Sequence, residues 1–261
     1  MSFKTLLSAV CLMISGALIS QEAPNKTDAA GKKQGLWIKL DENKKKMYEG
    51  NFTDNIPVGK FIYYYDTGTP WAITIFSEKG KIARTQHFNA AGKVVGEGKY
   101  ISEKKDSLWK FYNEEGKLIS EEFYKIGIKD GASKVFYASG QVAEEKIWKN
   151  GKLNGACKKY FETGQLKYSG QYINDKLEGK VTFIQPNGKT DAEGIYKNDL
   201  KDGPWKYYNL DGTIKRTDVY INGKMTGTDK DIVPKKQQDE EKKKYEQFDI
   251  KDPYQDGYDP Q

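Results

Sequence analysis

The sequence has very little of two residue types on which many catalytic and metal sites depend. It contains one histidine, His87, and two cysteines, Cys11 and Cys157, among 261 residues. A metal site built from several histidines is therefore excluded, and a Ser-His-Asp triad would have to use His87. Because Cys11 lies in a stretch that we expect to be removed, Cys157 is the only cysteine expected in the mature chain, and no intramolecular disulfide can form.

Apolar sequence is also scarce. Mean hydropathy is -0.82, and aromatic residues make up 13% of the chain, so a core must come largely from rings. The apolar run at 6–19 follows Lys4, which is typical of a secretory signal peptide and is too short for a membrane span. We expect residues 1–20 to be removed, with cleavage after Ala17 as the alternative, and no transmembrane segment afterwards.

The sequence is strongly repetitive. A small residue begins each of eight units, and the units follow one another every 24 residues without insertion or deletion. A large apolar or aromatic residue stands five positions into every unit, and an aromatic residue stands seventeen positions in. Self-similarity at a fixed period predicts a repeat architecture. The unit starts are Gly35, Gly59, Ala83, Ser107, Gly131, Gly155, Gly179 and Gly203.

Each unit predicts a β-hairpin. In the unit at 155–178, Gly164 can take the positive φ of a short loop between two strands. The second strand alternates, so we expect Leu166, Tyr168, Gly170 and Tyr172 to share one face. A second turn, from Asn174 to Gly179, reverses the chain into the next unit, and Asn-Gly pairs mark that turn at Asn150 and Asn222.

The repeat and its flanks predict the overall organisation. We expect an all-β fold, an elongated twisted antiparallel sheet of about eight 24-residue hairpins over residues 35–226. A linker at 21–34 precedes it, and a flexible charged tail at 227–261 follows it. The tail holds seven lysines against ten acidic residues, a net charge of -3, which leaves +8 on residues 21–226. The tail could fold onto the sheet, although a solvated surface and a loose tail are the plainer interpretation.

Three features suggest chemistry, and each also has a packing interpretation. His87 stands where other units carry rings, and Cys157 takes the position of Trp109 and Trp205, so we expect both to be packing residues. A row of glutamates could do acid-base work, but residues repeated in phase more often face lysines on adjacent strands. We therefore expect no catalytic residue, metal ligand or cofactor. The row is Glu49, Glu97, Glu121, Glu145 and Glu193.

Rings interleaved with lysines predict a binding surface. Segments such as 206–208, Lys-Tyr-Tyr, could stack on a flat ligand while meeting negative charge, and packing is the alternative role of these rings. An exported chain would not meet nucleic acid, which leaves a protein, a glycan or an anionic lipid headgroup. The candidate binding residues are Trp37, Tyr64, Trp109, Tyr112, Tyr160, Trp205 and Tyr208.

The repeated motif resembles that of a known repeat family. The spacing G-x-W-x-x-Y-x-x-x-G at 203–212, followed by Y-x-x-G at 220–223, resembles the MORN-repeat variant. The resemblance covers residues 35–227 and implies an elongated curved sheet of hairpins used in protein association, with lipid binding proposed for some members. It implies no catalytic residues. Bacterial members are often labelled YwqK-type antitoxins, and Gln21 as a mature start is similar to exported proteins of Bacteroidota.

Together these expectations predict a non-enzymatic scaffold for protein partners in the bacterial cell envelope. It would lie in the periplasm or at the outer membrane, for instance as an accessory subunit of an outer-membrane complex. A module that binds glycan or anionic lipid is one alternative. An antitoxin, as the family label implies, is the other.

Overall fold

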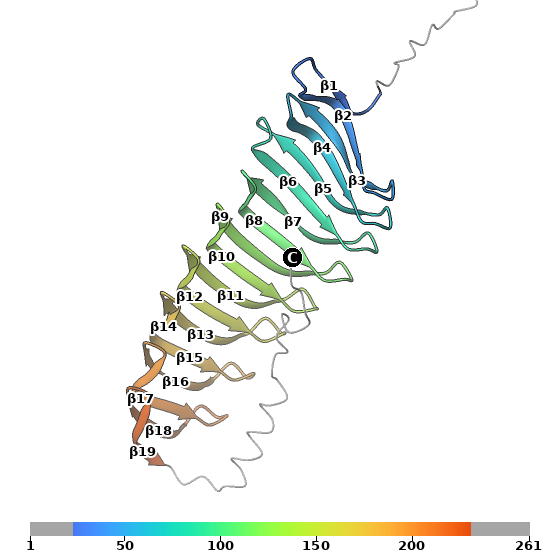
Figure 1. Ribbon diagram of the computed structural model, residues 1–261. Coiled ribbons are helices and arrows are strands. Elements are labelled where there is room, and N and C mark those ends of the chain that lie inside the picture. Colours follow the sequence, from blue (N-terminus) through green and yellow to red (C-terminus); the bar gives the residue numbers. More distant parts are fainter. Residues whose placement is uncertain (1–22, 231–261) are drawn as a thin grey trace, which may run out of the picture.

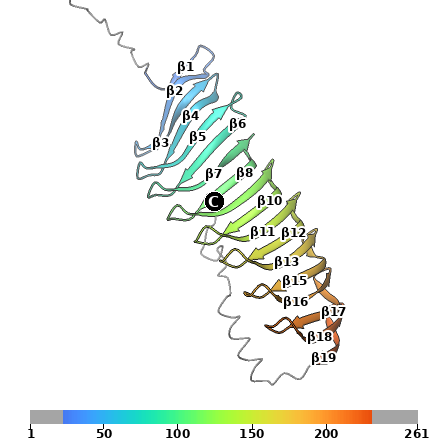
Figure 2. The ribbon, with the colours of Figure 1, turned by 180° about the vertical axis from the view of Figure 1, so that it is seen from behind.

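The computed structural model describes residues 23–230; the expected signal peptide at 1–20 and residues 231–261 of the expected tail lie outside them. The described chain is all-β, with nineteen strands in a single antiparallel sheet and no helix among the described residues. Strands that follow one another in the sequence are paired in the sheet, so the hairpins stand side by side in a long array (Figures 1 and 2). The predicted fold class is confirmed.

The strands agree with eight hairpins plus two additions at the ends. The strand predicted at the start of the seventh unit is interrupted at Glu178 and appears as β14 and β15. The strands are β1 (Lys26–Thr27), β2 (Lys33–Leu40), β3 (Lys46–Thr53), β4 (Ile56–Tyr64), β5 (Pro70–Ser77), β6 (Ile82–Phe88), β7 (Val94–Ile101), β8 (Lys104–Tyr112), β9 (Leu118–Lys125), β10 (Ile128–Phe136), β11 (Val142–Lys149), β12 (Lys152–Tyr160), β13 (Leu166–Ile173), β14 (Lys176–Leu177), β15 (Gly179–Ile184), β16 (Thr190–Lys197), β17 (Leu200–Tyr208), β18 (Ile214–Ile221) and β19 (Lys224–Lys230).

The array extends beyond the predicted range of 35–226 at both ends. In the segment at 21–34, β1 pairs with β2 through Lys26 and Thr27. At the other end, β19 continues to Lys230 and pairs with β18. The sheet therefore has a short two-residue strand at its first edge and a seven-residue strand at its last.

The two long edges of the array differ. One edge, here called the turn edge, consists of tight turns such as Asn150-Gly151, and the other, the loop edge, consists of longer loops such as that at 113–117 (Figure 1). Asn150 and Gly151 have φ of 50° and 78°, the left-handed values of a type I′ hairpin turn. The Gly151 amide donates to the Lys129 carbonyl of the preceding hairpin at 2.9 Å, so each such turn also joins its neighbour. The turns predicted at the Asn-Gly pairs are confirmed.

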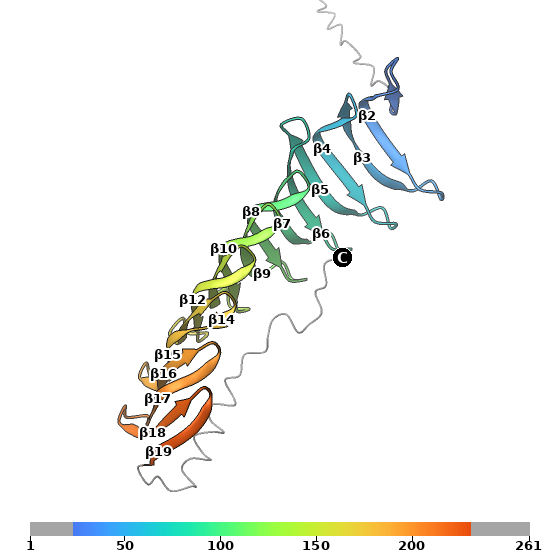
Figure 3. The same ribbon diagram turned by 60° about the vertical axis from the view of Figure 1, so that its left-hand side comes forward.

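The glycine that begins a unit is not part of the turn. The turn predicted to run from Asn174 to Gly179 consists of Asn174 and Asp175 alone, and Gly179 lies inside β15 with a φ of 80°. Gly155 likewise lies inside β12, and the pairing of β11 with β12 shifts register close to it. These glycines are β-bulges, which bend and twist a strand. Figure 3 shows strands bent along their length, most clearly at the end of the array near β19.

One face of the sheet carries the core, and we call it the ring face. Trp109 and Trp205 are each 1% exposed, although residues 23–230 form a single sheet with no second layer over it. Their indole nitrogens donate to the carbonyls of Lys99 and Ile195, at 3.0 and 3.2 Å. Edge-to-face rings from neighbouring strands close over them, Tyr100 over Trp109 and Tyr196 over Trp205.

Large and small residues alternate across the strands of this face. Three glycines lie beneath rings of the next hairpin: Gly50 beneath Phe61, Gly98 beneath Trp109 and Gly194 beneath Trp205. At three positions where the ring is replaced by a smaller residue, the residue opposite is larger than glycine: Thr74 faces Thr85, Glu122 faces Ser133 and Lys146 faces Cys157. The ring face is thus filled by complementary pairs from adjacent units.

One sequence expectation about this face is wrong. Leu166 does not lie with Tyr168 and Tyr172, because β12 and β13 shift register between Lys159 and Tyr160. Leu166 is paired with Tyr160, whose hydroxyl contacts Glu145 on the opposite face. A bulge moves every later side chain to the other face, which a simple alternation cannot anticipate.

Candidate functional site

The face opposite the rings carries a ladder of charges, and we call it the charged face. Glu97, Lys110, Glu121, Lys134 and Glu145 are direct register partners on five successive strands. The ammonium of Lys110 lies 3.7 Å from Glu121, and that of Lys134 lies 3.4 Å from Glu145. The prediction that the glutamates face lysines on adjacent strands is confirmed for these residues.

Four tyrosines tie adjacent units together on the same face. Tyr112 donates to Glu97 at 2.6 Å, and three equivalent pairs occur at intervals of 48 residues: Tyr64 with Glu49, Tyr160 with Glu145 and Tyr208 with Glu193. Burial and the hydrogen bond to Glu97 raise the pKa of Tyr112 to about 12. Bonds from Gln86 and Tyr112 lower the pKa of Glu97. The carboxylate of Glu97 is therefore held charged and hydrogen-bonded.

The structure does not bring the seven predicted binding residues onto one surface. Tyr64, Tyr112, Tyr160 and Tyr208 lie half-buried on the charged face, each bound to a glutamate. The three tryptophans lie on the ring face, where Trp109 and Trp205 are buried and so offer no surface to a partner. Trp37 is half-buried at the first edge, beneath the Lys33 ammonium at 4.6 Å.

His87 and Cys157 both occupy packed positions on the ring face. The imidazole of His87 stacks on Trp71 and on Trp109, with ring centroids 6.1 Å apart in each case, and burial lowers its pKa. Cys157 is buried beside Val181 and Tyr168, and burial raises the pKa of its thiol to about 11. A thiol with that pKa is not an activated nucleophile.

A surface that the sequence analysis missed runs along the turn edge of the charged face. Because side chains alternate along a strand, Glu145, Ile147 and Lys149 of β11 lie on this one face. Aliphatic or aromatic side chains follow the edge and are exposed, up to 58% at Ile221. With the lysines between them they form the Ile/Lys band: Ile75, Phe123, Ile128, Ile147, Ile173, Ile195, Leu200, Val219, Ile221, Lys104, Lys125, Lys149, Lys152, Lys176, Lys197 and Lys224.

The band has a pattern that the sequence does contain. The two residues that flank a turn are register partners, and five turns pair one aliphatic residue with one lysine. At the turn of Asn150 and Gly151, Lys149 stands directly opposite Lys152, and no ion pair of either is present among residues 23–230. Like charges placed opposite each other repel, so this part of the band suits a partner with negative charge.

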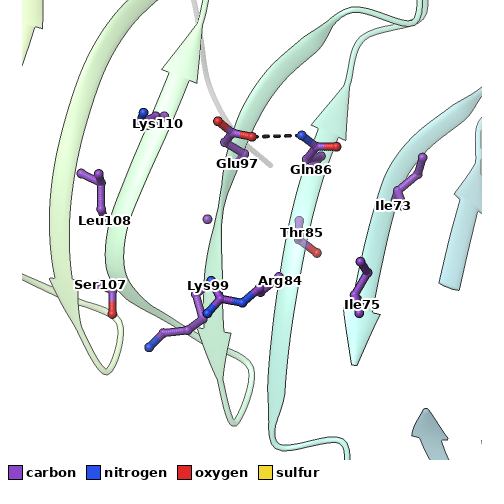
Figure 4. A pocket seen from close by; sticks show the side chains of 11 residues that line it. Ile73, Ile75, Arg84, Thr85, Gln86, Glu97, Lys99, Ser107, Leu108 and Lys110 are labelled. Atoms are coloured by element: carbon purple, nitrogen blue, oxygen red, sulfur yellow. Dashed lines mark hydrogen bonds between the residues drawn. The ribbon is translucent and has the colours of Figure 1, made fainter. Parts of the chain in front are cut away.

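The charged face is hollowed between β5 and β8, over a volume of about 600 Å³. Figure 4 shows Arg84 and Lys99 together at one end of this hollow and the Glu97–Gln86 hydrogen bond at the other. The lining residues are Ile73, Ile75, Arg84, Thr85, Gln86, Glu97, Gly98, Lys99, Ser107, Leu108 and Lys110.

The hollow coincides with an irregular unit. The turn between β5 and β6 has three residues with positive φ, Glu78, Lys79 and Gly80, instead of two. The next unit begins with Ala83 rather than glycine, and β5 pairs with β6 without the register shift that the hairpins on either side show. The replacement of glycine by Ala83 is visible in the sequence, but its effect on the face is not.

Comparisons with known proteins agree with this architecture. Four stretches match the MORN repeat variant, at 105–125, 129–150, 153–174 and 201–222, and two match the MORN repeat, at 48–69 and 168–190. MORN repeats are commonly modules that bind proteins or lipids. No curated protein matches the chain.

The solved structures that match this chain resemble it only weakly. A point mutant of S. aureus TarM, in complex with fondaparinux, alpha-GlcNAc-glycerol and UDP, is 21% identical over 37% of this chain, with a TM-score of 0.28. A second TarM structure is 20% identical over 36% of this chain, with a TM-score of 0.27. The chain spans about a fifth of the length of these proteins, 19% and 20%.

Proposed function

We propose that this chain, a member of the MORN-repeat family, is a non-enzymatic scaffold that holds partner proteins in the bacterial cell envelope, as an accessory subunit of an outer-membrane complex would. The observation that carries the proposal is the Ile/Lys band. Exposed apolar side chains gathered along one edge of a face, with lysines among them, are typical of an interaction site.

The packed positions of the reactive residues support a role without catalysis. His87 lies between two indole rings, and Cys157 is buried with its thiol protonated at neutral pH. The Glu97 carboxylate, which could act as a base, accepts hydrogen bonds from both Gln86 and Tyr112. A carboxylate held by hydrogen bonds from two neighbouring strands has a structural role in the sheet.

The location in the envelope rests on the sequence. None of the described residues forms a helix long and apolar enough to cross a membrane. A reporter fused behind residues 1–25 should be exported to the periplasm. Retention of the reporter in the cytoplasm would contradict the envelope location and favour the antitoxin alternative.

The scaffold is tested by crosslinking in intact cells, followed by purification of the full chain from the envelope fraction. Replacing two exposed band residues together, Ile173→Ser with Ile221→Ser, should reduce the recovery of crosslinked partners about tenfold, because two apolar anchors are lost. Leu210→Ser, at an exposed leucine of the loop edge, is the control and should recover partners as the native chain does. Recovery of the chain alone would contradict the proposal.

An anionic lipid surface is the second candidate, because the band is rich in lysine. Flotation with phosphatidylglycerol vesicles tests it, and Lys149→Gln with Lys152→Gln should abolish flotation if lipid is the ligand. Flotation of the native chain without any crosslinked partner would replace the scaffold by a lipid-binding module. Repeating the purification with residues 231–261 removed shows whether they contribute to the recovery of partners.

A further inference from the structure

We propose that the hollow between β5 and β8 is an anchor site for an acidic peptide segment, in which a carboxylate side chain adjoins an aliphatic one. The inference rests on the proposed function and deepens it, because the hollow lies on the same face as the Ile/Lys band and shares Ile75 with it. It names the chemistry by which a partner would be recognised.

Positive charge is concentrated at this point of the sheet. Arg84 is the register partner of both Ile75 and Lys99, so two cations stand directly opposite each other on β6 and β7, and Lys60 lies on the far side of Ile75. Cations placed side by side without a carboxylate between them are destabilising unless an anion joins them. Lys99 has a carboxylate on its far side, Asp106 at 3.2 Å.

Arg84 is the cation of this group for which the described residues provide no carboxylate partner. Among the described residues, the structure shows no hydrogen bond or ion pair of its guanidinium. The chain has one other arginine, Arg216, which is paired with Asp218 at 3.1 Å and stacked on Tyr207 at 4.0 Å. A guanidinium binds a carboxylate through two parallel hydrogen bonds, so Arg84 has the geometry to hold one acidic side chain.

The walls of the hollow specify the rest of the ligand. Ile73 and Ile75 lie on one side and Leu108 on the other, with Ile75 54% exposed. Glu97 also lines the hollow, but its oxygens accept from Gln86 and Tyr112, so it does not occupy Arg84. A volume of about 600 Å³ is within the range for a bound small ligand and exceeds the needs of a single ion.

A peptide fits these features better than a lipid surface does. A flat bilayer meets the side chains along the whole Ile/Lys band, whereas the hollow places Arg84 between aliphatic walls, with Ile73 and Ile75 on one side and Leu108 on the other. An acidic side chain carried on an extended segment can enter the hollow, and an aliphatic neighbour on that segment can contact Ile75 or Leu108. Free phosphate would use the cations alone and leave the aliphatic walls uncovered.

The two arginines allow a direct test. Full-length protein labelled with nitrogen-15 in arginine alone should give two Nε signals, one for Arg84 and one for Arg216. The probe is a blocked tetrapeptide, Glu-Ile-Glu-Ile, compared with Gln-Ile-Gln-Ile, Glu-Ser-Glu-Ser and inorganic phosphate. We expect the first peptide to shift the Arg84 signal in a saturable way, the others to bind about tenfold more weakly, and the Arg216 signal to stay in place.

Variants make the test specific. Arg84→Gln should weaken binding of a fluorescent Glu-Ile-Glu-Ile peptide about tenfold, without loss of the β-sheet circular dichroism spectrum. Lys93→Gln, which removes an exposed charge from the loop between β6 and β7, should leave binding unchanged. An unmoved Arg84 signal, equal binding of the uncharged peptide or of phosphate, or full binding by Arg84→Gln would each overturn the proposal.

Failure of the peptide-binding test can be told apart from failure of the scaffold proposal. If the native chain and Arg84→Gln recover the same partners from cells while the peptide fails to bind, the anchor site is refuted and the scaffold stands. If the peptide binds at Arg84 but no partner is recovered, the scaffold is refuted and the site stands.

Discussion

Gly98→Ala tests whether the array is held together by rings that lie over glycines. An added Cβ at Gly98 would lie within 2.7 Å of three indole atoms of Trp109, closer than real Cβ atoms approach other groups. The backbone of Gly98 does not have the positive φ that would itself disfavour alanine. Trp109 is fully buried, so its ring has no open direction in which to move.

The expected cost follows from two opposing effects. Overpacking a filled core costs about 1–3 kcal/mol. Replacing glycine by alanine returns about 0.4–1 kcal/mol, because the unfolded chain has fewer conformations to lose. We therefore expect Gly98→Ala to lower the free energy of unfolding by about 1–2 kcal/mol, with faster amide hydrogen exchange in β7 and β8.

Two comparisons make this result interpretable in urea unfolding followed by circular dichroism. Gly96→Ala, in the same strand, would place a Cβ 3.6 Å from Phe111, an ordinary contact, and should leave stability unchanged or slightly raised. In a Trp109→Val background the clash is gone, so Gly98→Ala should cost nothing further. If Gly98→Ala behaves like Gly96→Ala, or if its cost persists beside Val at position 109, the reasoning is wrong.

Two tyrosines of the charged face and one strained turn residue can each be tested separately. Tyr112→Phe should cost about 1 kcal/mol in urea unfolding and raise the pKa of Glu97, measured by NMR of its carboxyl carbon, because a donor to the carboxylate is lost. The pKa values of Tyr64 and Tyr112 are raised to about 12, whereas the pKa of an unfolded tyrosine is about 10. The stability that these two tyrosines contribute should therefore be complete below pH 10 and decline as the pH approaches 12. Tyrosinate absorbance and circular dichroism, recorded together, measure this decline. Ile126 holds a φ of 49° in a turn where four other units have asparagine, so Ile126→Asn should raise stability by about 1 kcal/mol, and a loss would show that its side chain is needed there.

The repeat itself was sufficient to predict the architecture. A fixed 24-residue period with glycines and aromatic residues in phase predicted hairpins, and the structure has them. The Asn-Gly pairs predicted the turns, because two successive positive φ values are tolerated by few other residues. The row of glutamates predicted cross-strand lysines, since residues in phase on neighbouring strands meet.

What the sequence could not supply is the face on which a residue lies. Each unit contains bulges, and a bulge of one residue reverses the alternation that follows it, as at Leu166 and Tyr168. The predicted binding residues were chosen by type and were therefore distributed over both faces, with Trp109 buried and Tyr112 on the opposite side. The hollow depends on a bulge that is absent beside Ala83, and only the assembled sheet shows the result.

The pairing of tyrosines with glutamates every 48 residues sets the length by which this array can be shortened. Removing one unit, residues 83–106, would bring Tyr112 beside Ile73 without its carboxylate and would place Trp109 over Thr74 instead of Gly98. Removing two, residues 83–130, would bring Phe136 and Ser133 to the places that Phe88 and Thr85 now hold. The structural period is thus four strands, about 19 Å along the array. Shortened or lengthened versions should fold when they change by whole multiples of that period.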